Sequence, residues 1–386
     1  MKLTVKPLVL AVLMACTITA AQAAETTGPI QATQKSASVK VTEQAVAKAV
    51  YELAYSPTQN EVFIMAPVFE KDLKAGMKPQ VARLNGDTLK PEGATDLPSA
   101  GFGTVLDDAN HTLYIGTHNS TVIAYDTETN KVKGEIQLAG KEKDKKTGKE
   151  NPTHFLRQLR FDAKNQRLYI PGLSFKGSVL YVVDTRTFKL IKTVENTGLM
   201  STGITQAPDG GDIILTNWQH EMVVVDSKTL DIKNRVSIPV DQPLFLAWNT
   251  ERKEVLAVDE GLDKIYGMLK KGAQETGKTY QSKSKGNALV VIDPQNGKVL
   301  RTIPTGKQPV AVKVDDKAGR IYVTALEGGS VSVYSTKDYS LLNTVEVKPS
   351  ANSIAINSKD GSIYISVKNF ASKDKTDKEK VAHLQF

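Results

Sequence analysis

The chain is poor in cysteine and in aromatic residues. Its 386 residues include one cysteine, Cys16, and two tryptophans, and only 6% of the residues are aromatic. Cys16 lies in an N-terminal segment that we expect to be removed, so the mature chain would hold no cysteine. Without cysteine a protein forms no disulfide, thiolate metal site, iron–sulfur cluster or haem bound through a C-x-x-C-H motif. These classes of protein are therefore excluded for the mature chain.

Long apolar runs are equally scarce. One run, 8–20, follows two lysines and precedes a small-x-small triplet at 21–23. This order is typical of a signal peptide, so we predict that residues 1–23 are cleaved after Ala23 and that the chain is exported. An alternative is a lipoprotein, because 13–16 (Leu-Met-Ala-Cys) loosely resembles a lipid-attachment box. No other apolar run is long enough to span a bilayer.

What the chain does contain is one pattern that recurs about seven times. An apolar strand and a turn precede a Leu/Ile-Tyr-Ile/Val strand, a loop, a Val-x-Val-x-Asp strand and a return rich in threonine and lysine. The segments that begin at Thr112, Arg167 and Arg320 show it most clearly. Successive third strands end about 42 residues apart, with insertions, as in the four-stranded blades of β-propellers. We therefore predict an all-β fold, a single seven-bladed β-propeller of four-stranded blades.

The last repeat has only three strands of its own. An open ring would expose strand edges, which promote aggregation. We predict that 38–49 supplies the missing outer strand and closes the ring, so that 38–386 forms the propeller. The preceding 24–37 is small and polar, which is typical of a disordered lead-in. No long amphipathic helix is apparent, and only 41–53 comes near one.

The repeat carries a family resemblance. A "YVT"-type strand followed by a Val-x-Val-[Ile/Tyr]-Asp strand resembles the YVTN β-propeller repeat family of exported bacterial proteins. The segments 48–56 (KAVYELAYS), 196–204 (NTGLMSTGI) and 362–369 (SIYISVKN) are similar to a periplasmic member of that family. This resemblance implies a seven-bladed, non-enzymatic periplasmic protein that binds single-stranded DNA. The chain departs from the family in its long lysine-rich loops.

Those loops fall on one side of the predicted ring. Insertions 66–79, 259–286 and 368–380 join second to third strands, and 139–153 joins one blade to the next. Both kinds of connection emerge on the same face of a propeller. Nearly all the net positive charge of the mature chain lies in these four insertions, as a site for a polyanion requires. The alternative is that lysine-rich loops only keep the protein soluble.

The richest insertion defines the predicted interface. Segment 264–286 holds six lysines and one acidic residue. Lysine neutralises phosphate, and an aromatic ring offers a base a surface to stack on. The channel mouth adds an aromatic pair (Tyr51 and Phe102), Arg157 and the amide of Asn352. Arg157 could instead form a structural ion pair with a neighbouring blade, and Trp218, on the same face, could pack between blades. The predicted nucleic-acid-binding residues are Lys264, Tyr266, Lys270, Lys271, Lys278, Tyr280, Lys283, Lys285, Arg157, Trp218, Phe102 and Asn352.

Catalytic motifs are not apparent. His118, His154 and His220 fall on the loop side, but no short ligand spacing supports a metal site. Four aspartates recur once per blade, which indicates a turn-capping role: Asp126, Asp184, Asp226 and Asp293. No nucleophile elbow or phosphate-binding glycine loop is present. We predict a monomer with neither cofactor nor enzymatic activity.

Two other functions stay open at this stage. One is an envelope scaffold that binds a protein or an acidic glycan, which would use the same basic face without needing aromatic residues. The other is an enzyme, either a quinoprotein-like oxidoreductase or a lactone hydrolase, because propellers host many unrelated functions.

Overall fold

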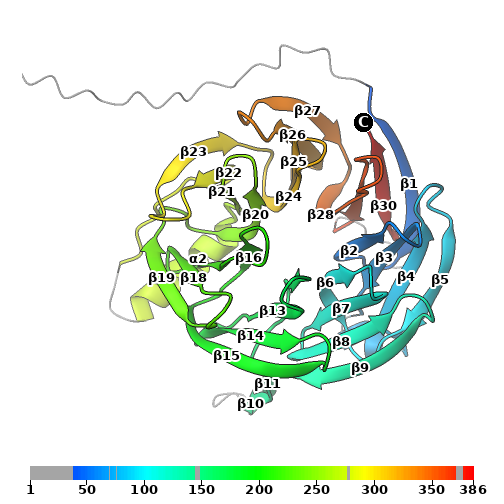
Figure 1. The fold of residues 1–386 in the computed structure, drawn as a ribbon, viewed down its shortest axis with the longest axis horizontal. Coiled ribbons are helices and arrows are strands. Elements are labelled where there is room, and N and C mark those ends of the chain that lie inside the picture. The colour runs from blue at the N-terminus through cyan, green and yellow to red at the C-terminus, as the bar shows by residue number, and fades with distance from the viewer. Residues whose placement is uncertain (1–37, 69, 75, 144–147, 276–278, 371–376) are drawn as a thin grey trace, which may run out of the picture. The chain divides into compact units, whose positions relative to one another are not determined.

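A computed structural model describes residues 38–386, apart from 69, 75, 144–147, 276–278 and 371–376. The predicted signal peptide and lead-in, 1–37, lie outside the described residues. The described chain forms seven antiparallel four-stranded sheets arranged around a ring (Figure 1). The prediction of an all-β, seven-bladed propeller is therefore confirmed.

The blades follow one another along the chain. Blade 1 contains β2 (Leu53–Ser56), β3 (Glu61–Ala66), β4 (Gln80–Asn85) and β5 (Pro91–Asp96), and blade 2 contains β6 (Gly101–Asp107), β7 (Thr112–Thr117), β8 (Thr121–Asp126) and β9 (Lys131–Gln137). Blade 3 contains β12 (Arg160–Asp162), β13 (Arg167–Gly172), β14 (Ser178–Asp184) and β15 (Lys189–Gly198), and blade 4 contains β16 (Gly203–Gln206), β17 (Ile213–Asn217), β18 (Glu221–Val225) and β19 (Ile232–Ser237). Blade 5 contains β20 (Pro243–Asn249), β21 (Glu254–Asp259), β22 (Ala288–Ile292) and β23 (Val299–Pro304), and blade 6 contains β24 (Pro309–Asp315), β25 (Arg320–Ala325), β26 (Ser330–Ser335) and β27 (Leu341–Glu346).

Blade 7 is assembled from both ends of the described chain. It contains β28 (Ser350–Ile356), β29 (Ile363–Lys368), β30 (Glu379–Gln385) and, as its outer strand, β1 (Lys40–Ala47). β1 pairs antiparallel with β30, from Lys40 opposite Gln385 to Ala45 opposite Lys380. Figure 1 shows the two strands, blue and red, side by side. The predicted closure of the ring by the N-terminal strand is confirmed.

Buried polar contacts strengthen this closure. The Glu379 carboxylate accepts a hydrogen bond from the Val50 amide at 2.7 Å and from the Asn369 amide at 3.0 Å. The Lys368 ammonium donates to the Val50 carbonyl at 2.6 Å and lies 3.4 Å from Glu379. We call these four residues the clasp. Because Lys368 and Glu379 are both buried, they depend on each other for compensation of their charge.

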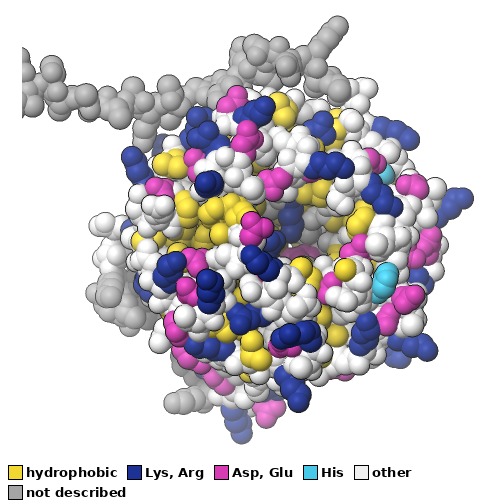
Figure 2. Space-filling model, in the orientation of Figure 1, with side chains coloured by type: hydrophobic (Ala, Val, Ile, Leu, Met, Phe, Trp, Pro, Cys, Tyr) yellow, Lys and Arg dark blue, Asp and Glu magenta, His cyan; other side chains and the backbone are white. Residues whose placement is uncertain are grey.

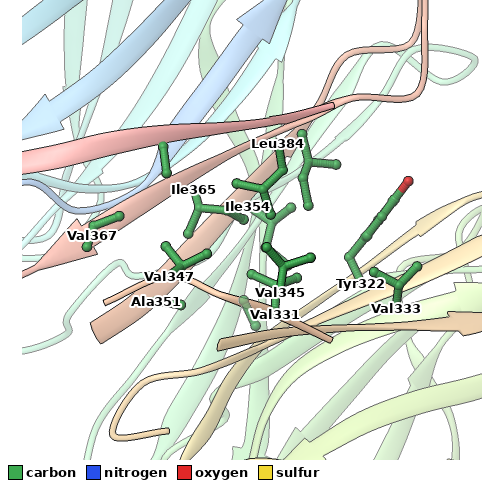
Figure 3. Close-up of a cluster of buried hydrophobic side chains, with 13 residues drawn as sticks. Tyr322, Val331, Val333, Val345, Val347, Ala351, Ile354, Ile365, Val367 and Leu384 are labelled. Atoms are coloured by element: carbon green, nitrogen blue, oxygen red, sulfur yellow. The ribbon is translucent and has the colours of Figure 1, made fainter. Parts of the chain in front are cut away.

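The apolar core lies between the blades. Strands such as β7 (Thr112–Thr117) are buried on both faces, whereas the outer strand β9 (Lys131–Gln137) alternates between exposed and half-buried residues. This difference follows from the radial arrangement, because inner strands are covered by sheets on both sides. Figure 3 shows one core cluster, in which Tyr322 and Val333 of blade 6 lie near Ile354 and Ile365 of blade 7.

The recurring aspartates close the turns between third and fourth strands. Asp126 accepts the amide hydrogens of Glu128 and Thr129, each at 2.9 Å. Asp184, Asp226 and Asp293 accept amide hydrogens of their own turns in the same way. The predicted capping role is confirmed, and it follows from the ability of a short carboxylate to mimic a backbone acceptor.

Two helices and a hairpin interrupt the β pattern. They are α1 (Glu70–Lys74), α2 (Asp263–Glu275) and the hairpin of β10 (Lys141–Lys143) and β11 (Glu150–Pro152). The expectation of no long helix is wrong for α2, in which Ile265, Tyr266 and Leu269 form a half-buried side. Within the described ranges, no helix has the length and apolar character to cross a membrane.

Candidate nucleic-acid interface

The long insertions share one face of the ring, which we call the loop face. Within a four-stranded antiparallel blade, the connection between strands two and three emerges at the same end as the connection to the next blade. α1 lies between β3 and β4, α2 lies between β21 and β22, and the β10–β11 hairpin lies between blades 2 and 3. The predicted placement of the insertions on one face is therefore confirmed.

The blade 5 insertion leaves the propeller through a narrow neck of two glycines. Gly261 and Gly286 have φ angles of 70° and 67°. A Cβ atom on Gly286 would lie 2.2 Å from the Cα atom of Gly261, and one on Gly261 would lie 2.8 Å from the amide nitrogen of Asn287. Only glycine combines such close backbone approach with a positive φ. The insertion is thus an addition to a blade whose β21 and β22 pair without it.

Asp241 holds the far side of this insertion. Its side chain is completely buried and accepts hydrogen bonds from the His220 ring at 2.8 Å, the Lys283 amide at 3.0 Å and the Ser282 hydroxyl. Its own amide donates to the Ser284 hydroxyl at 3.0 Å. Burial alone would raise the pKa of Asp241, but these hydrogen bonds outweigh it and hold the pKa well below its usual range.

Five of the six predicted lysines of this insertion lie in the described chain and are exposed. They are Lys264, Lys270, Lys271, Lys283 and Lys285, whereas Lys278 lies outside the described residues. An open hollow of about 490 Å³ lies between α2 and the returning segment. Tyr266, Lys270, Ser282 and Lys285 are among its lining residues. The fold thus brings lysines from two separated segments around one hollow.

The two tyrosines of the insertion are half-buried. The Tyr266 hydroxyl is 3.5 Å from the Ser284 carbonyl, and burial raises the pKa of Tyr266 to about 12. The Tyr280 ring lies 5.9 Å from the His220 ring, and burial with the nearby Asp241 carboxylate raises its pKa as well. Both rings therefore help to pack the insertion, and each leaves part of its surface open to solvent.

A denser aromatic cluster lies at the mouth of the central channel. The ring centroids of Tyr51 and Phe102 are 5.0 Å apart and nearly perpendicular. The Arg157 guanidinium lies 5.3 Å and the Lys368 ammonium 5.1 Å from the Tyr51 centroid. These distances are typical of cation–π contacts. We call this group, together with His118, Phe155 and Phe370, the mouth cluster: Tyr51, Phe102, His118, Phe155, Arg157, Lys368 and Phe370.

The rest of the mouth cluster extends over three blades. His118 lies 4.4 Å from Phe155 and 5.8 Å from Phe102, measured between ring centroids. Phe370 is 67% exposed, and its ring lies 5.5 Å from the Lys368 ammonium. Phe102 and Arg157 belong to the predicted set, whereas Phe155 and Lys368 do not. The position of Phe155 and Lys368 in the repeat could have indicated them, because each lies at the loop-face end of its blade, level with the predicted residues.

Electrostatics distinguish the cations of the mouth cluster from surface lysines. Arg157 is exposed to solvent, yet surrounding protein lowers its pKa, and the Glu260 charge only partly opposes that effect. Burial lowers the pKa of Lys368 too, opposed by Glu379. Arg157, which is open to water but surrounded by protein, therefore lines the channel, whereas Lys368 is buried beside it. Figure 2 views the ring along its axis and shows a central hollow with both basic and acidic side chains around it.

The remaining predicted residues lie apart from this cluster. The half-buried Trp218 packs edge-on against Phe175, with ring centroids 5.8 Å apart, so it joins blades 3 and 4. Phe175 is 52% exposed and extends this aromatic surface into solvent. The Asn352 amide donates to the Ser366 hydroxyl at 3.2 Å, which ties it to its own blade.

The three loop-face histidines serve separate contacts. His118 belongs to the mouth cluster, His154 bonds the Tyr181 hydroxyl at 2.6 Å and His220 bonds Asp241. Among the described residues, no group of three or more potential metal-ligating His, Cys, Asp or Glu side chains comes together.

Comparison with known proteins agrees with this architecture. Proteins named "Uncharacterized protein YncE" from Salmonella typhi and Escherichia coli (strain K12) are each 29% identical to the chain. The first match spans 298 residues, 71% of this chain and 82% of the relative, and the second spans 268 residues, 69% and 68%. The chain is a YncE-like β-propeller. The resemblance inferred from segments such as 48–56 is thereby confirmed, although no protein-family model matches the chain.

Proposed function

We propose that the loop face binds single-stranded nucleic acid, most readily single-stranded DNA, in the periplasm and without chemical change to it. The YncE-like resemblance implies the same class of ligand. Stacking on aromatic rings and contact with phosphates do not depend on the identity of the base, so the expected sequence preference is weak.

The mouth cluster carries this proposal. Two cations, Arg157 and Lys368, contact the ring of Tyr51, and the exposed ring of Phe370 lies beside them. Stacked bases need aromatic faces, and the phosphates between them need positive charge. Lys368 is held by the Val50 carbonyl and Glu379 in the clasp, so the exposed Arg157 is the cation of this cluster that can meet a phosphate.

The blade 5 insertion extends the site along the face. Its exposed lysines, with Lys270 and Lys285 around the hollow beside Tyr266, supply positive charge at the surface. Such lysines neutralise phosphates regardless of sequence. We assign phosphate binding to these lysines and base stacking to the rings of the mouth cluster, with Trp218 and the two tyrosines of the insertion as secondary surfaces.

Fluorescence anisotropy with a labelled single strand of about 20 nucleotides tests the proposal. If four phosphates are contacted, affinity should fall roughly 50-fold between 50 and 200 mM salt, since each contact adds about −0.7 to the logarithmic slope. The double variant Lys270→Ala/Lys271→Ala should reduce that fall to roughly 7-fold. Phe102→Leu with Phe370→Ala should weaken binding and leave the salt slope unchanged.

A matched control uses two lysines of the opposite face. Lys228 and Lys298 are exposed and lie in turns between third and fourth strands. Lys228→Ala/Lys298→Ala removes the same charge and should leave both affinity and slope intact. Loss of affinity in this control, or equal competition by heparin with no effect of the aromatic variants, would show a general polyanion surface. Absence of binding at 50 mM salt would favour an envelope protein as the partner.

A further inference from the structure

Two cations occupy one layer inside the ring. Arg160 of β12 pairs with Tyr169, and Lys313 of β24 pairs with Tyr322. Both therefore stand at the same register position, on the innermost strands of blades 3 and 6. Three blades separate them in a ring of seven, so they stand on nearly opposite sides of the channel. The residues at this position in the other five blades are Ala54, Val105, Thr205, Ala247 and Ala355.

The small residues of this layer leave space that the two cations enter. Ala54, Thr205 and Ala247 are buried, whereas Arg160 and Lys313 are exposed to solvent. Protein nevertheless surrounds both cations, since burial lowers the pKa of each, and the Arg160 charge lowers the pKa of Lys313 further. Solvent contact combined with surrounding protein and a position on the innermost strands places the two side chains in the central channel, where the Arg160 charge acts on Lys313.

Within the described residues, neither cation is held in a close ion pair, and the Asp162 charge only partly opposes the lowering of the Arg160 pKa by burial. In the described part of the chain, no carboxylate lies within 4.0 Å of Arg160 or Lys313, and neither side chain makes a hydrogen bond. The nearest acidic influence on Lys313 is Glu52, whose carboxylate accepts the Thr104 amide through one oxygen at 3.0 Å. The other Glu52 oxygen is buried without a partner. Asp162 and Glu52 act on these cations only from beyond ion-pair distance, so two cations on facing sides of a channel are costly unless an anion joins them.

We propose that the central channel binds a small oxyanion of the phosphate type between Arg160 and Lys313. This site is separate from the loop face and goes beyond the function proposed for it. Arg160 offers a planar fork of donors and Lys313 a point charge, which together suit a tetrahedral anion with two negative charges. The anion is either free inorganic phosphate or the terminal phosphate of a nucleic acid, because both present the same group.

Glu52 makes the site sensitive to pH. Burial raises its pKa to about 7, against the opposing effects of Lys313 and the Thr104 amide. The other charged groups near this part of the channel are Arg160, which acts on Lys313, and Arg157 at the mouth. Two carboxylates act on these arginines, Asp162 on Arg160 and Glu260 on Arg157. An anion entering beside an ionised Glu52 is repelled, and protonation removes that repulsion. Anion affinity should therefore rise as the pH falls through 7.

Equilibrium dialysis with radiolabelled sulfate tests the site, since the charge of sulfate does not change between pH 5 and 9. The mature chain, in chloride-free buffer at constant ionic strength, should bind one sulfate saturably. Arg160→Met/Lys313→Met should weaken binding about tenfold or more, as expected for loss of charge-assisted hydrogen bonds. The loop-face variant Lys270→Ala/Lys271→Ala should bind sulfate like the parent. Unfolding curves establish that each variant is folded.

The pH dependence of sulfate binding is a second test of the site, and it does not rely on the double variant. Sulfate should bind about fivefold more tightly at pH 6 than at pH 8 if the anion raises the Glu52 pKa by one unit, from about 7. Glu52→Gln should bind at pH 8 as the parent does at pH 6. Non-saturable binding, or binding that ignores both the double variant and Glu52→Gln, would overturn the proposal.

Competition distinguishes the two sources of the anion. Inorganic phosphate that displaces sulfate while a 5′-phosphorylated oligonucleotide does not would identify a free anion as the ligand. Displacement by the 5′-phosphorylated strand, but not by the same strand without its phosphate, would identify a nucleic-acid end. Failure of the loop-face variants to alter DNA binding would leave this result untouched, so the two proposals can fail independently.

Discussion

Blade 7 and the blade 5 insertion both depart from the plain repeat, but they differ in how they are attached. Blade 7 joins strands from the two ends of the described chain, and the buried clasp of Val50, Lys368, Asn369 and Glu379 stabilises that joint. The insertion enters and leaves through one glycine neck and carries exposed lysines. The propeller needs the first for its stability, whereas the second adds a binding surface to a blade that is already complete.

The largest expected effect is the loss of β1. Deleting residues 24–50 removes the outer strand of blade 7 and the Val50 end of the clasp, leaving β30 as an open edge. We expect loss of the cooperative unfolding transition, measured by circular dichroism during urea titration. Deleting 24–36 instead should leave the transition intact. A folded, monomeric product from the longer deletion would contradict the closing role of β1.

The clasp should show the next largest effect. Lys368→Met leaves the buried Glu379 carboxylate without its cation and should cost about 3–5 kcal/mol of unfolding free energy. Lys380→Met provides a matched control in the same blade, because its pair with Glu43 is solvent-exposed and should contribute less than about 1 kcal/mol. Urea unfolding of both variants measures the difference, and equal losses would show that the clasp does not depend on burial.

Glu52, two residues after Val50, should make stability depend on pH. Burial raises its folded pKa from 4.5 to about 7. Between these values the folded state binds more protons than the unfolded state, so the contribution of Glu52 to stability falls as pH rises and is lost above 7. The total change is roughly 3 kcal/mol. Glu52→Gln should remove this component from the stability measured between pH 4.5 and 8, and an unchanged pH profile would contradict the assignment.

The smallest effect on stability should come from removing the insertion itself. Because Gly261 and Gly286 nearly touch, replacing 262–285 by a short turn should keep β21 and β22 paired. We expect a loss of about 1–2 kcal/mol of unfolding free energy, because Asp241 exchanges the hydrogen bonds of Ser282 and Lys283 for water. Binding of single-stranded DNA should become weaker and less salt-dependent. A large loss of stability would show that the insertion also supports the blade.

The architecture could be predicted because it is repeated. Each blade restates the same strand pattern and the same turn aspartate, and a last repeat with only three strands indicated where β1 must pair. The helix α2 was missed because Gly267 and Gly272 lower its intrinsic helix propensity, while the half-buried side formed by Ile265 and Leu269 supports it. A search for apolar residues three and four positions apart would have found it.

The channel residues were harder to predict for a different reason. Lys368 contacts Val50 across 318 residues of sequence. Arg160 and Lys313 come to lie in one layer of the channel only when the ring closes. Each is one basic residue in an ordinary strand, with nothing nearby in sequence to single it out. The number of lysines in a segment locates charge, but only the closed ring shows which cations it brings into the channel.

The pairing of β1 with β30 also sets an order in time. Of the described strands, β1 is synthesised first and β30 last. Lys40 therefore cannot pair with Gln385 until the other six blades have been synthesised, each of which forms from neighbouring segments. Contacts between such distant segments form late, because a long loop must be ordered first. A chain that stops before Glu379 offers β1 no partner and leaves strand edges open to other molecules. Closure of the ring thus distinguishes chains that contain β30, in which the edge of β1 is paired, from shorter chains, whose open strand edges a protease or chaperone can recognise.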